Sequence, residues 1–449
     1  MKIWQKNFDV NEIIERFTIG KDRDLDLDLA WFDVVGSIAH IRMLLEINLL
    51  SEDEYERLYN GLRAILKEIE SKKFKIHEGV EDIHSQVEIL LTNSLGEVGK
   101  KIHSGRSRND QILLDLKLFM RHNIKEIVEL THNLFNRLIN LSESYKHILM
   151  PGYTHFQVAM PSSFGLWFGA YAESLTDDLR YLKAAFDIIN QNPLGSAAGY
   201  GTSFPVNRQL TTELLGFDDM NYNVIYAQMG RGKAEKILAN SMGLIAETLG
   251  RLSADVCLYM GQNYGFISFP DEYTTGSSIM PHKKNPDVFE LIRGRCNKIK
   301  ALTNGISLLT TNLPAGYHRD MQLIKEDLFD AITSLKDCLY IAEFMLSHIE
   351  VNDNILEDDR YRYIYSVEKV NALVLEGMSF RDAYKKVAKM IEDGTYQSDH
   401  EVRHTHIGSI GNLSNDKILE KMEPLIEYFN DKFNAIRMKL DHLSGSNPG

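Results

Sequence analysis

The sequence predicts an all-α protein built around unusually long helices. Proline and glycine are both absent from residues 106–150 and again from residues 317–376. Because both residues break helices, these gaps allow helices well beyond the usual 10–14 residues. Strand signals are sparse, and only KFKIH at residues 73–77 and the Asp393-Gly394 turn suggest hairpins.

The elements follow from the spacing of apolar residues. In the first gap, apolar side chains recur every three or four residues, as one face of a helix requires. They are Leu113, Leu116, Met120, Ile124, Ile127, Leu134, Leu138 and Leu141. A second long helix is predicted after Pro161 and a third over residues 234–260.

These helices predict three domains. Shorter helices fill residues 1–105, the long bundle takes residues 106–354, and a compact helical cap takes residues 355–449. Long helices expose apolar stripes that one chain does not cover easily, so we expect a homo-oligomer.

Composition excludes several classes of protein. The net charge of −13 argues against nucleic acid as a partner, because phosphate binding needs clustered cations. The three cysteines, Cys257, Cys296 and Cys338, are too far apart in sequence for a disulfide framework or a zinc site. No signal peptide or membrane span is recognisable, so we expect a cytoplasmic protein.

Three polar clusters carry the candidate chemistry. The first is the proline-bounded loop GSSIMPHKKNP at residues 276–286. Its hydroxyl, ammonium and amide donors suit a carboxylate that gains charge in a transition state. The alternative is a solvated turn.

The second cluster, HSGRSRND at residues 103–110, lies where the longest helix is predicted to begin. Free amides at a helix start attract anions, and two arginines can grip a carboxylate. Ser107 or Asn109 as a simple N-cap beside exposed arginines is the alternative.

The third cluster, MPGYTHFQ at residues 150–157, follows that helix. An isolated loop histidine such as His155 is usually structural. Its imidazole can also act as an acid or base near neutral pH if a carboxylate such as Glu290 orients it.

Together the clusters resemble one family. GSSIMPHKKNP is similar to the signature loop of the fumarase/aspartase superfamily, and GYTHFQ with HSGRSRNDQ resembles its argininosuccinate lyase family. Further similar segments are EDIH at 81–84, GSIAH at 36–40, NPLGS at 192–196 and the stretch 317–325. The resemblance implies a three-domain, fumarase/aspartase-like fold whose long bundle assembles into a homotetramer with active sites shared between subunits.

The resemblance also implies a reaction. Members cleave argininosuccinate to arginine and fumarate in arginine biosynthesis, by anti elimination through a carbanion, without a cofactor or metal. Ser277 would remove the proton, activated by the charge of Lys283. Six side chains would hold the doubly charged intermediate, namely Lys283, Asn285, Arg108, Asn109, Ser107 and Thr154.

The remaining roles concern the leaving group and the arginine end. His155, oriented by Glu290, would help protonate the departing nitrogen. The residues implied to contact the substrate's other parts are Tyr317, Gln322, Lys325 and, at the arginine end, Asp26.

The chain departs from the family pattern in three places. His282 stands where glutamine is usual, and the segment TIGKDRD at 18–24 replaces a shorter serine-containing stretch. The segment around Arg231 also differs, although Arg231 still matches a substrate contact. Recognition of the arginine end is therefore open, including whether an acylated substrate is accepted.

Alternative functions are another fumarate-releasing lyase, of the adenylosuccinate lyase or aspartase type, and a silent structural homologue. GRSRND argues against the first and the intact catalytic set against the second. Two metal-like motifs are rejected. The aspartates at 22, 24, 26 and 28 resemble a calcium loop, but Leu27 takes the glycine position, and His404-Thr405-His406 lacks a third ligand.

Overall fold

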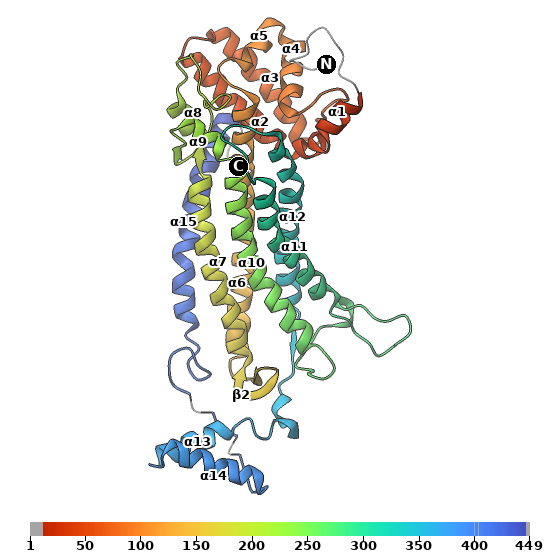
Figure 1. The fold of residues 1–449 in the computed structure, drawn as a ribbon, viewed down its shortest axis with the longest axis vertical. Helices are drawn as coiled ribbons and strands as arrows, with labels where there is room; N and C mark the ends of the chain where they lie inside the picture. The colour runs from red at the N-terminus through yellow and green to blue at the C-terminus, as the bar shows by residue number, and fades with distance from the viewer. Residues whose placement is uncertain (1–11, 399, 403, 446–449) are drawn as a thin grey trace.

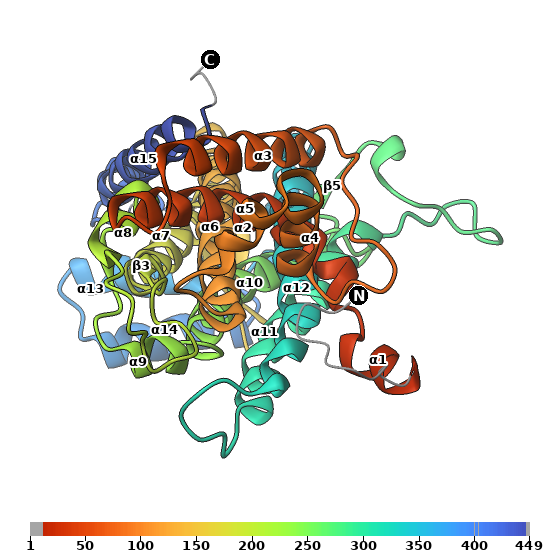
Figure 2. The ribbon, with the colours of Figure 1, turned by 90° about the horizontal axis from the view of Figure 1, so that it is seen from above.

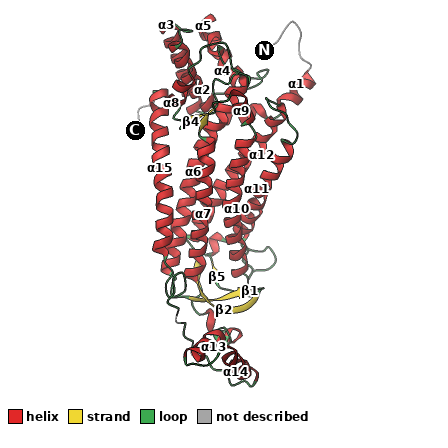
Figure 3. Cartoon of the chain, turned by 60° about the vertical axis from the view of Figure 1, so that its left-hand side comes forward, coloured by secondary structure: helices red, strands yellow, loops and turns green. Residues whose placement is uncertain are grey.

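The computed structural model describes residues 12–398, 400–402 and 404–445. The molecule is elongated, with short helices at one end, long helices parallel to its axis in the middle, and a small helical unit at the other end (Figure 1). Seen from above, α6 lies among the other long helices (Figure 2). The predicted all-α class is confirmed, and the few strands are short (Figure 3).

The helices at the upper end are short apart from α2 and α3. They are α1 (Glu12–Ile19), α2 (Asp22–Glu46), α3 (Glu52–Glu70), α4 (Ile83–Leu95), α5 (Glu97–Lys100), α8 (Arg208–Leu214) and α9 (Val224–Met229). The long helices are α6 (Arg108–Ser144), α7 (Phe164–Ile189), α10 (Lys233–Tyr259), α11 (Asp287–Leu309), α12 (Ile324–Leu346) and α15 (Asn415–Ser444). The lower unit holds α13 (Ser366–Leu375) and α14 (Phe380–Glu392).

Short strands and 3₁₀ turns connect these helices. The strands are β1 (Leu149–Thr154), β2 (Gln157–Ser163), β3 (Gln191–Asn192), β4 (Asp219–Met220), β5 (Ile267–Ser268) and β6 (Glu350–Val351). The 3₁₀ turns are η1 (Lys101–His103), η2 (Asp271–Tyr273), η3 (Arg319–Leu323), η4 (Ile355–Glu357) and η5 (Asp359–Tyr361). No helix in the described ranges is long and apolar enough to cross a membrane.

Helix α6 is the axis of the bundle. It packs against α7, α12, α2 and α15, and of the predicted apolar stripe only Leu141 is not fully buried. Its first half is buried on nearly every side, from Leu113 to Arg121. The spacing of apolar residues therefore located both the helix and its buried face correctly.

The second gap without proline or glycine does not hold one long helix. Helix α12 ends at Leu346, and the chain then forms β6 and a polar turn. In that turn Oδ1 of Asn352 accepts a hydrogen bond from the backbone of Asn354, 3.0 Å away. The helix itself ends earlier, where the Ser347 hydroxyl donates to the carbonyl of Phe344 at 2.6 Å. A short polar side chain there competes with the helical hydrogen bonds, and no breaker residue is needed.

A β-hairpin lies at residues 149–163, where no hairpin was predicted. Strands β1 and β2 pair antiparallel, with Pro151 opposite Pro161. The tip residues His155 and Phe156 have φ of 54° and 59°, the left-handed conformation of a tight hairpin turn. By contrast, residues 73–77 form no strand, and Asp393-Gly394 is the turn that ends α14. Both hairpin expectations were wrong.

The C-terminal part divides in two. Helices α13 and α14 form a small core of their own around Val370, Leu373, Ala383 and Val387. Helix α15 instead returns to the bundle and packs on α7 and α6. The predicted domain division at residue 355 stays a prediction, with α15 lying on the neighbouring bundle.

Candidate active site

A polar cavity of about 240 Å³ opens at the upper end of the bundle. Its walls come from the start of α2, the segment before α4, the start of α6 and the start of α12. Six of the predicted substrate-binding residues line it: Asp26, Arg108, Asn109, Tyr317, Gln322 and Lys325. The other lining residues are Asp22, Glu81, Asp82, His84, Ile112, Arg231 and Arg319.

The start of α6 forms one wall. Ser107 is the N-cap of this helix, and its hydroxyl accepts a hydrogen bond from the Asn109 backbone at 3.3 Å. The N-cap role of Ser107 is confirmed, although Arg106 and Arg108 beside it are half-buried rather than exposed. The binding of a carboxylate by this cluster stays a prediction. The positive end of the helix dipole adds to the attraction for anions here.

Arg108 is held by acidic neighbours. Its Nη1 lies 3.1 Å from Glu81 and 3.0 Å from Asp82, and its Nη2 donates to the Ser85 hydroxyl at 2.5 Å. Burial alone would raise the pKa of Asp82, but the charges of His84 and Arg108 outweigh it and lower that pKa. The guanidinium is thus oriented before any substrate carboxylate arrives.

The opposite wall joins α2 to α12. Nζ of Lys325 lies 2.7 Å from Asp26 and 2.6 Å from Asp22, and all three side chains are largely withdrawn from water. The second oxygen of Asp26 accepts a hydrogen bond from the Ile83 backbone at 3.2 Å. The four aspartates of the rejected calcium motif lie on a helix, and Asp26 is bound to a lysine.

Gln322 connects this wall to the altered segment 18–24. Its Nε2 donates to the carbonyls of Thr18 and Ile19, both at 3.1 Å, and its Oε1 accepts from Arg319 at 3.1 Å. Tyr317 lines the same cavity and is partly exposed.

The Ser277 loop lies elsewhere, in a segment between α10 and α11 that projects away from the bundle (Figures 1 and 2). Oγ of Ser277 accepts hydrogen bonds from the backbone N–H groups of Ile279 and Met280, at 3.3 and 3.1 Å. Two N–H groups aimed at one hydroxyl oxygen stabilise negative charge on it, as a serine acting as a base requires.

The two other predicted donors of this loop are differently placed. Asn285 is half-buried and closes the loop by donating its backbone N–H to the Thr275 carbonyl at 2.8 Å. Lys283 is exposed, and in the described part of the chain its ammonium forms no ion pair or side-chain hydrogen bond. Lys283 is therefore free to meet an anion from outside the chain.

The third cluster is at the lower hairpin. Thr154 and His155 are both exposed near its tip. Glu290, the carboxylate predicted to orient His155, lies at the start of α11 and is 3.9 Å from Arg293. No described contact joins Glu290 to His155 within the chain, so their pairing stays a prediction.

The length of α6 keeps these clusters apart. Its 37 residues span about 55 Å at 1.5 Å per residue, with Arg108 at one end and the hairpin just beyond the other. The fold of one chain therefore does not bring the three predicted clusters together.

Comparisons with known proteins identify the family. A family model described as "Lyase" matches residues 5–300. The argininosuccinate lyase of Bacteroides thetaiotaomicron is 59% identical over 429 residues, 96% of each chain. That of Parabacteroides distasonis is 57% identical over 442 residues, 98% of this chain and 99% of the relative.

The chain belongs to the argininosuccinate lyase family.

The fold agrees with this membership. A solved structure described as an EDDS lyase variant with bound fumarate has a TM-score of 0.76 and 21% identity, and the match covers 96% of this chain and 94% of that one. The resemblance seen in the sequence is confirmed, while the roles of single residues stay predictions.

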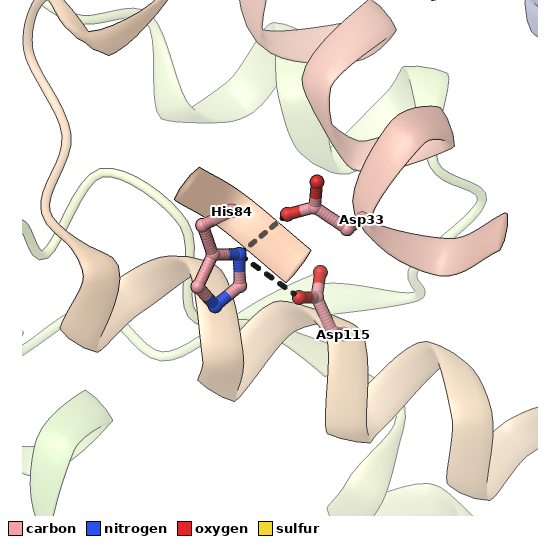
Figure 4. Close-up of side chains that lie close together, drawn as sticks. All are labelled: Asp33, His84 and Asp115. Atoms are coloured by element: carbon pink, nitrogen blue, oxygen red, sulfur yellow. Dashed lines mark hydrogen bonds and ion pairs between the residues drawn. The ribbon is translucent and has the colours of Figure 1, made fainter. Parts of the chain in front are cut away.

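In this member of the argininosuccinate lyase family, a buried cluster of charged side chains lies beneath the wall of the cavity. Asp33 of α2 and Asp115 of α6 flank His84 of α4, with Nδ1 of His84 at 2.6 Å from Asp33 and 3.6 Å from Asp115 (Figure 4). Burial opposes the charged imidazole, but Asp33, Asp115 and Asp82 together raise the pKa of His84 to about 9.

The distances in this cluster suit a charged hydrogen bond rather than a bound metal ion. The three ligand atoms lie within 4.8 Å of one another. Two ligands of one tetrahedral metal ion at about 2.1 Å stand about 3.4 Å apart, whereas 2.6 Å between nitrogen and oxygen is the distance of a charged hydrogen bond. His84 therefore carries a positive charge into the wall of the argininosuccinate lyase cavity.

Sequence reasoning assigned no role to five polar residues of this cavity, namely Asp22, Glu81, Asp82, His84 and Arg319. Arg319 lies six residues before Lys325 and reaches Glu81 across the cavity. Asp22 was noted in a false calcium motif and in the segment 18–24 that departs from the family pattern, but without a role of its own. Its spacing of four residues from Asp26 was the available signal, because that spacing places both on one helix face.

Proposed function

We propose that this chain cleaves argininosuccinate into arginine and fumarate. The cavity at the upper end carries the proposal, because its charges match both ends of this substrate. Arg108 and the start of α6 suit a succinyl carboxylate, while Asp26 and Lys325 suit the charged amino-acid end of an arginine. The near-full-length relatives named argininosuccinate lyase support the same conclusion.

The chemical step begins with proton removal. Ser277 takes the proton from the carbon beside a succinyl carboxylate, and the electron pair moves into that carboxylate. The backbone donors of residues 279 and 280 stabilise the serine oxyanion that does this. The free ammonium of Lys283 and the amide of Asn285 meet the extra negative charge on the substrate.

The step ends with loss of the nitrogen. As the electron pair returns to form the double bond of fumarate, the carbon–nitrogen bond breaks and arginine leaves. His155, oriented by Glu290, delivers a proton towards the departing guanidino nitrogen. Arg108, Asn109, Ser107 and Thr154 complete the set of donors around the succinyl end.

Assembly into a homotetramer supplies what one chain lacks. The start of α6, the hairpin tip and the Ser277 loop lie far apart in a single chain but meet when they come from neighbouring copies. Argininosuccinate is the small-molecule partner, and neither nucleic acid nor membrane takes part. The cytoplasm is the compartment expected for such biosynthetic chemistry.

Release of fumarate, followed by its ultraviolet absorbance, tests the proposal. Purified protein is mixed separately with argininosuccinate, adenylosuccinate, aspartate and malate. We expect release from argininosuccinate alone. Release only from one of the others would overturn the substrate and keep the type of reaction, and no release from any of the four would contradict both.

A further inference from the structure

The first two turns of α2 present two carboxylates to the cavity. Asp22 and Asp26 are four residues apart, so they lie on one face of the helix. The Asp26 side chain is 2% exposed and that of Asp22 is 16% exposed. Lys325, 4% exposed, lies between them and binds both.

This group of three side chains is short of one positive charge. Two carboxylates face one ammonium, which leaves one negative charge in a largely buried place. Two cations close to Asp22 are already paired, because Arg231 lies 2.6 Å from Glu235 and Lys21 lies 2.8 Å from Glu326. Burial, the largest influence, raises the pKa of Asp22 to about 6, which agrees with this shortage.

The free acceptor belongs to Asp22 rather than to Asp26. Both oxygens of Asp26 are used, one by Lys325 and the other by the Ile83 backbone. Asp22 gives one oxygen to Lys325, and its other oxygen accepts no hydrogen bond from the part of the chain that the structure describes. A cation that enters this end of the cavity therefore meets Asp22 first.

The position of Asp22 is fixed by the segment before it. Gln322 holds the carbonyls of Thr18 and Ile19, and Lys21 is paired across to α12. This segment is the one that departs from the family pattern. The segment that departs from the family pattern therefore helps to form the wall of the cavity.

We infer that Asp22 binds the free α-ammonium of the arginine part of the substrate, and so makes the enzyme reject substrates acylated at that nitrogen. Lys325 is left to bind the neighbouring α-carboxylate. This inference rests on the proposed function and names the form of its substrate. An acyl amide is neutral and bulkier, so it would leave the excess carboxylate without a partner.

Turnover of two substrates by matched variants tests the inference. Asp22→Asn and Asp22→Ser remove the charge, while Asp24→Asn, on the exposed side of the same turn, is the control. The wild type should prefer argininosuccinate over Nα-acetylargininosuccinate in kcat/KM by on the order of 100-fold or more. Asp22→Asn should lose about 10- to 100-fold on argininosuccinate, mainly through KM, and little on the acetylated substrate.

Two results would overturn it. One is a wild type that accepts both substrates equally, and the other is an Asp22→Asn variant that loses the same factor on both. The control should keep the wild-type preference.

A binding measurement separates this inference from the proposed function. Calorimetry with L-arginine and Nα-acetyl-L-arginine needs no turnover. Preference for arginine that disappears in Asp22→Asn supports the inference even if no fumarate is released. Equal binding of the two by the wild type contradicts it even if argininosuccinate is cleaved.

Discussion

The hydroxyl of Ser277 is held by backbone N–H groups of its loop rather than by neighbouring side chains. Two N–H groups point at its oxygen, and the nearest residues of its loop are exposed. Removing the hydroxyl should remove the base but leave the packing intact. We therefore expect Ser277→Ala to lower kcat by about 10²- to 10⁴-fold with no change in the unfolding midpoint.

The adjacent hydroxyl provides the matched control. Ser278 is exposed in the same loop, so Ser278→Ala should keep most of the activity. Assays of fumarate release and thermal unfolding decide the matter. Full activity in Ser277→Ala would remove this residue from the mechanism.

His84 makes the stability of the protein depend on pH. Its folded pKa of about 9 is above its ordinary value of 6.5, so its charge stabilises the fold fully below about pH 6.5. This contribution, on the order of 3 kcal/mol, should disappear as the pH rises through about 9.

Urea unfolding measures this effect at one protein concentration. The difference in unfolding free energy between wild type and His84→Gln should be large at about pH 6 and small at about pH 10. A difference that is constant across this range would show that His84 is not charged in the folded protein.

At the scale of elements, the start of α6 depends on one buried carboxylate. Asp110 accepts hydrogen bonds from the backbones of Ser107, Gly195 and Ala197, at 2.8, 3.0 and 2.8 Å. It therefore caps the helix and also ties residues 195–197 to it. Asp110→Ala would leave three donors without a partner.

We expect Asp110→Ala to cost about 2–4 kcal/mol of stability and to weaken substrate binding through the displaced Arg108. Chemical denaturation and KM measure the two effects. Asp53→Ala is a suitable comparison, because Asp53 lies in the first turn of α3 but is exposed and should change little. Equal effects of the two substitutions would contradict the capping role.

The helices could be predicted and the hairpin could not, for a physical reason. Absence of glycine and proline marked α6, and regular apolar spacing marked its buried face. The hairpin contains Pro151 opposite Pro161, residues that disfavour strands, and its turn uses His155 and Phe156 where glycine or asparagine is usual. Tertiary context outweighed local preference there.

At the scale of the whole molecule, each active site should need residues from more than one copy of the chain. A variant that lacks Arg108 and one that lacks Ser277 damage clusters that we assign to different copies in the same site. Mixed oligomers should therefore contain some intact sites. With random equal mixing, about one quarter of the sites would be intact.

Co-refolding of Arg108→Ala and Ser277→Ala chains in equal amounts tests this arrangement. We expect about a quarter of wild-type activity, while each variant alone is nearly inactive. A double variant carrying both changes, refolded with an inactive single variant, is the negative control. No recovery in the mixture would place both clusters in one chain.

The site could be predicted in part. Six of the predicted substrate-binding residues line one cavity because α2, α6 and α12 begin at the same end of the bundle. No described contact joins Ser277, His155 and Glu290 in the single chain. We propose that their partners come from other copies, and contacts between copies leave no periodic pattern in one sequence. Asp22 was missed because an acid at a helix start usually serves the helix itself.

The length of α6 also decides when catalysis can start during the life of a chain. If each site is built from several copies, as we propose, a newly synthesised copy with its clusters about 55 Å apart has no working site. Turnover then appears only after copies have met, so its onset should rise more steeply than in proportion to the amount of protein made. Gene dosage and dilution should therefore change the specific activity, which is the turnover per amount of protein.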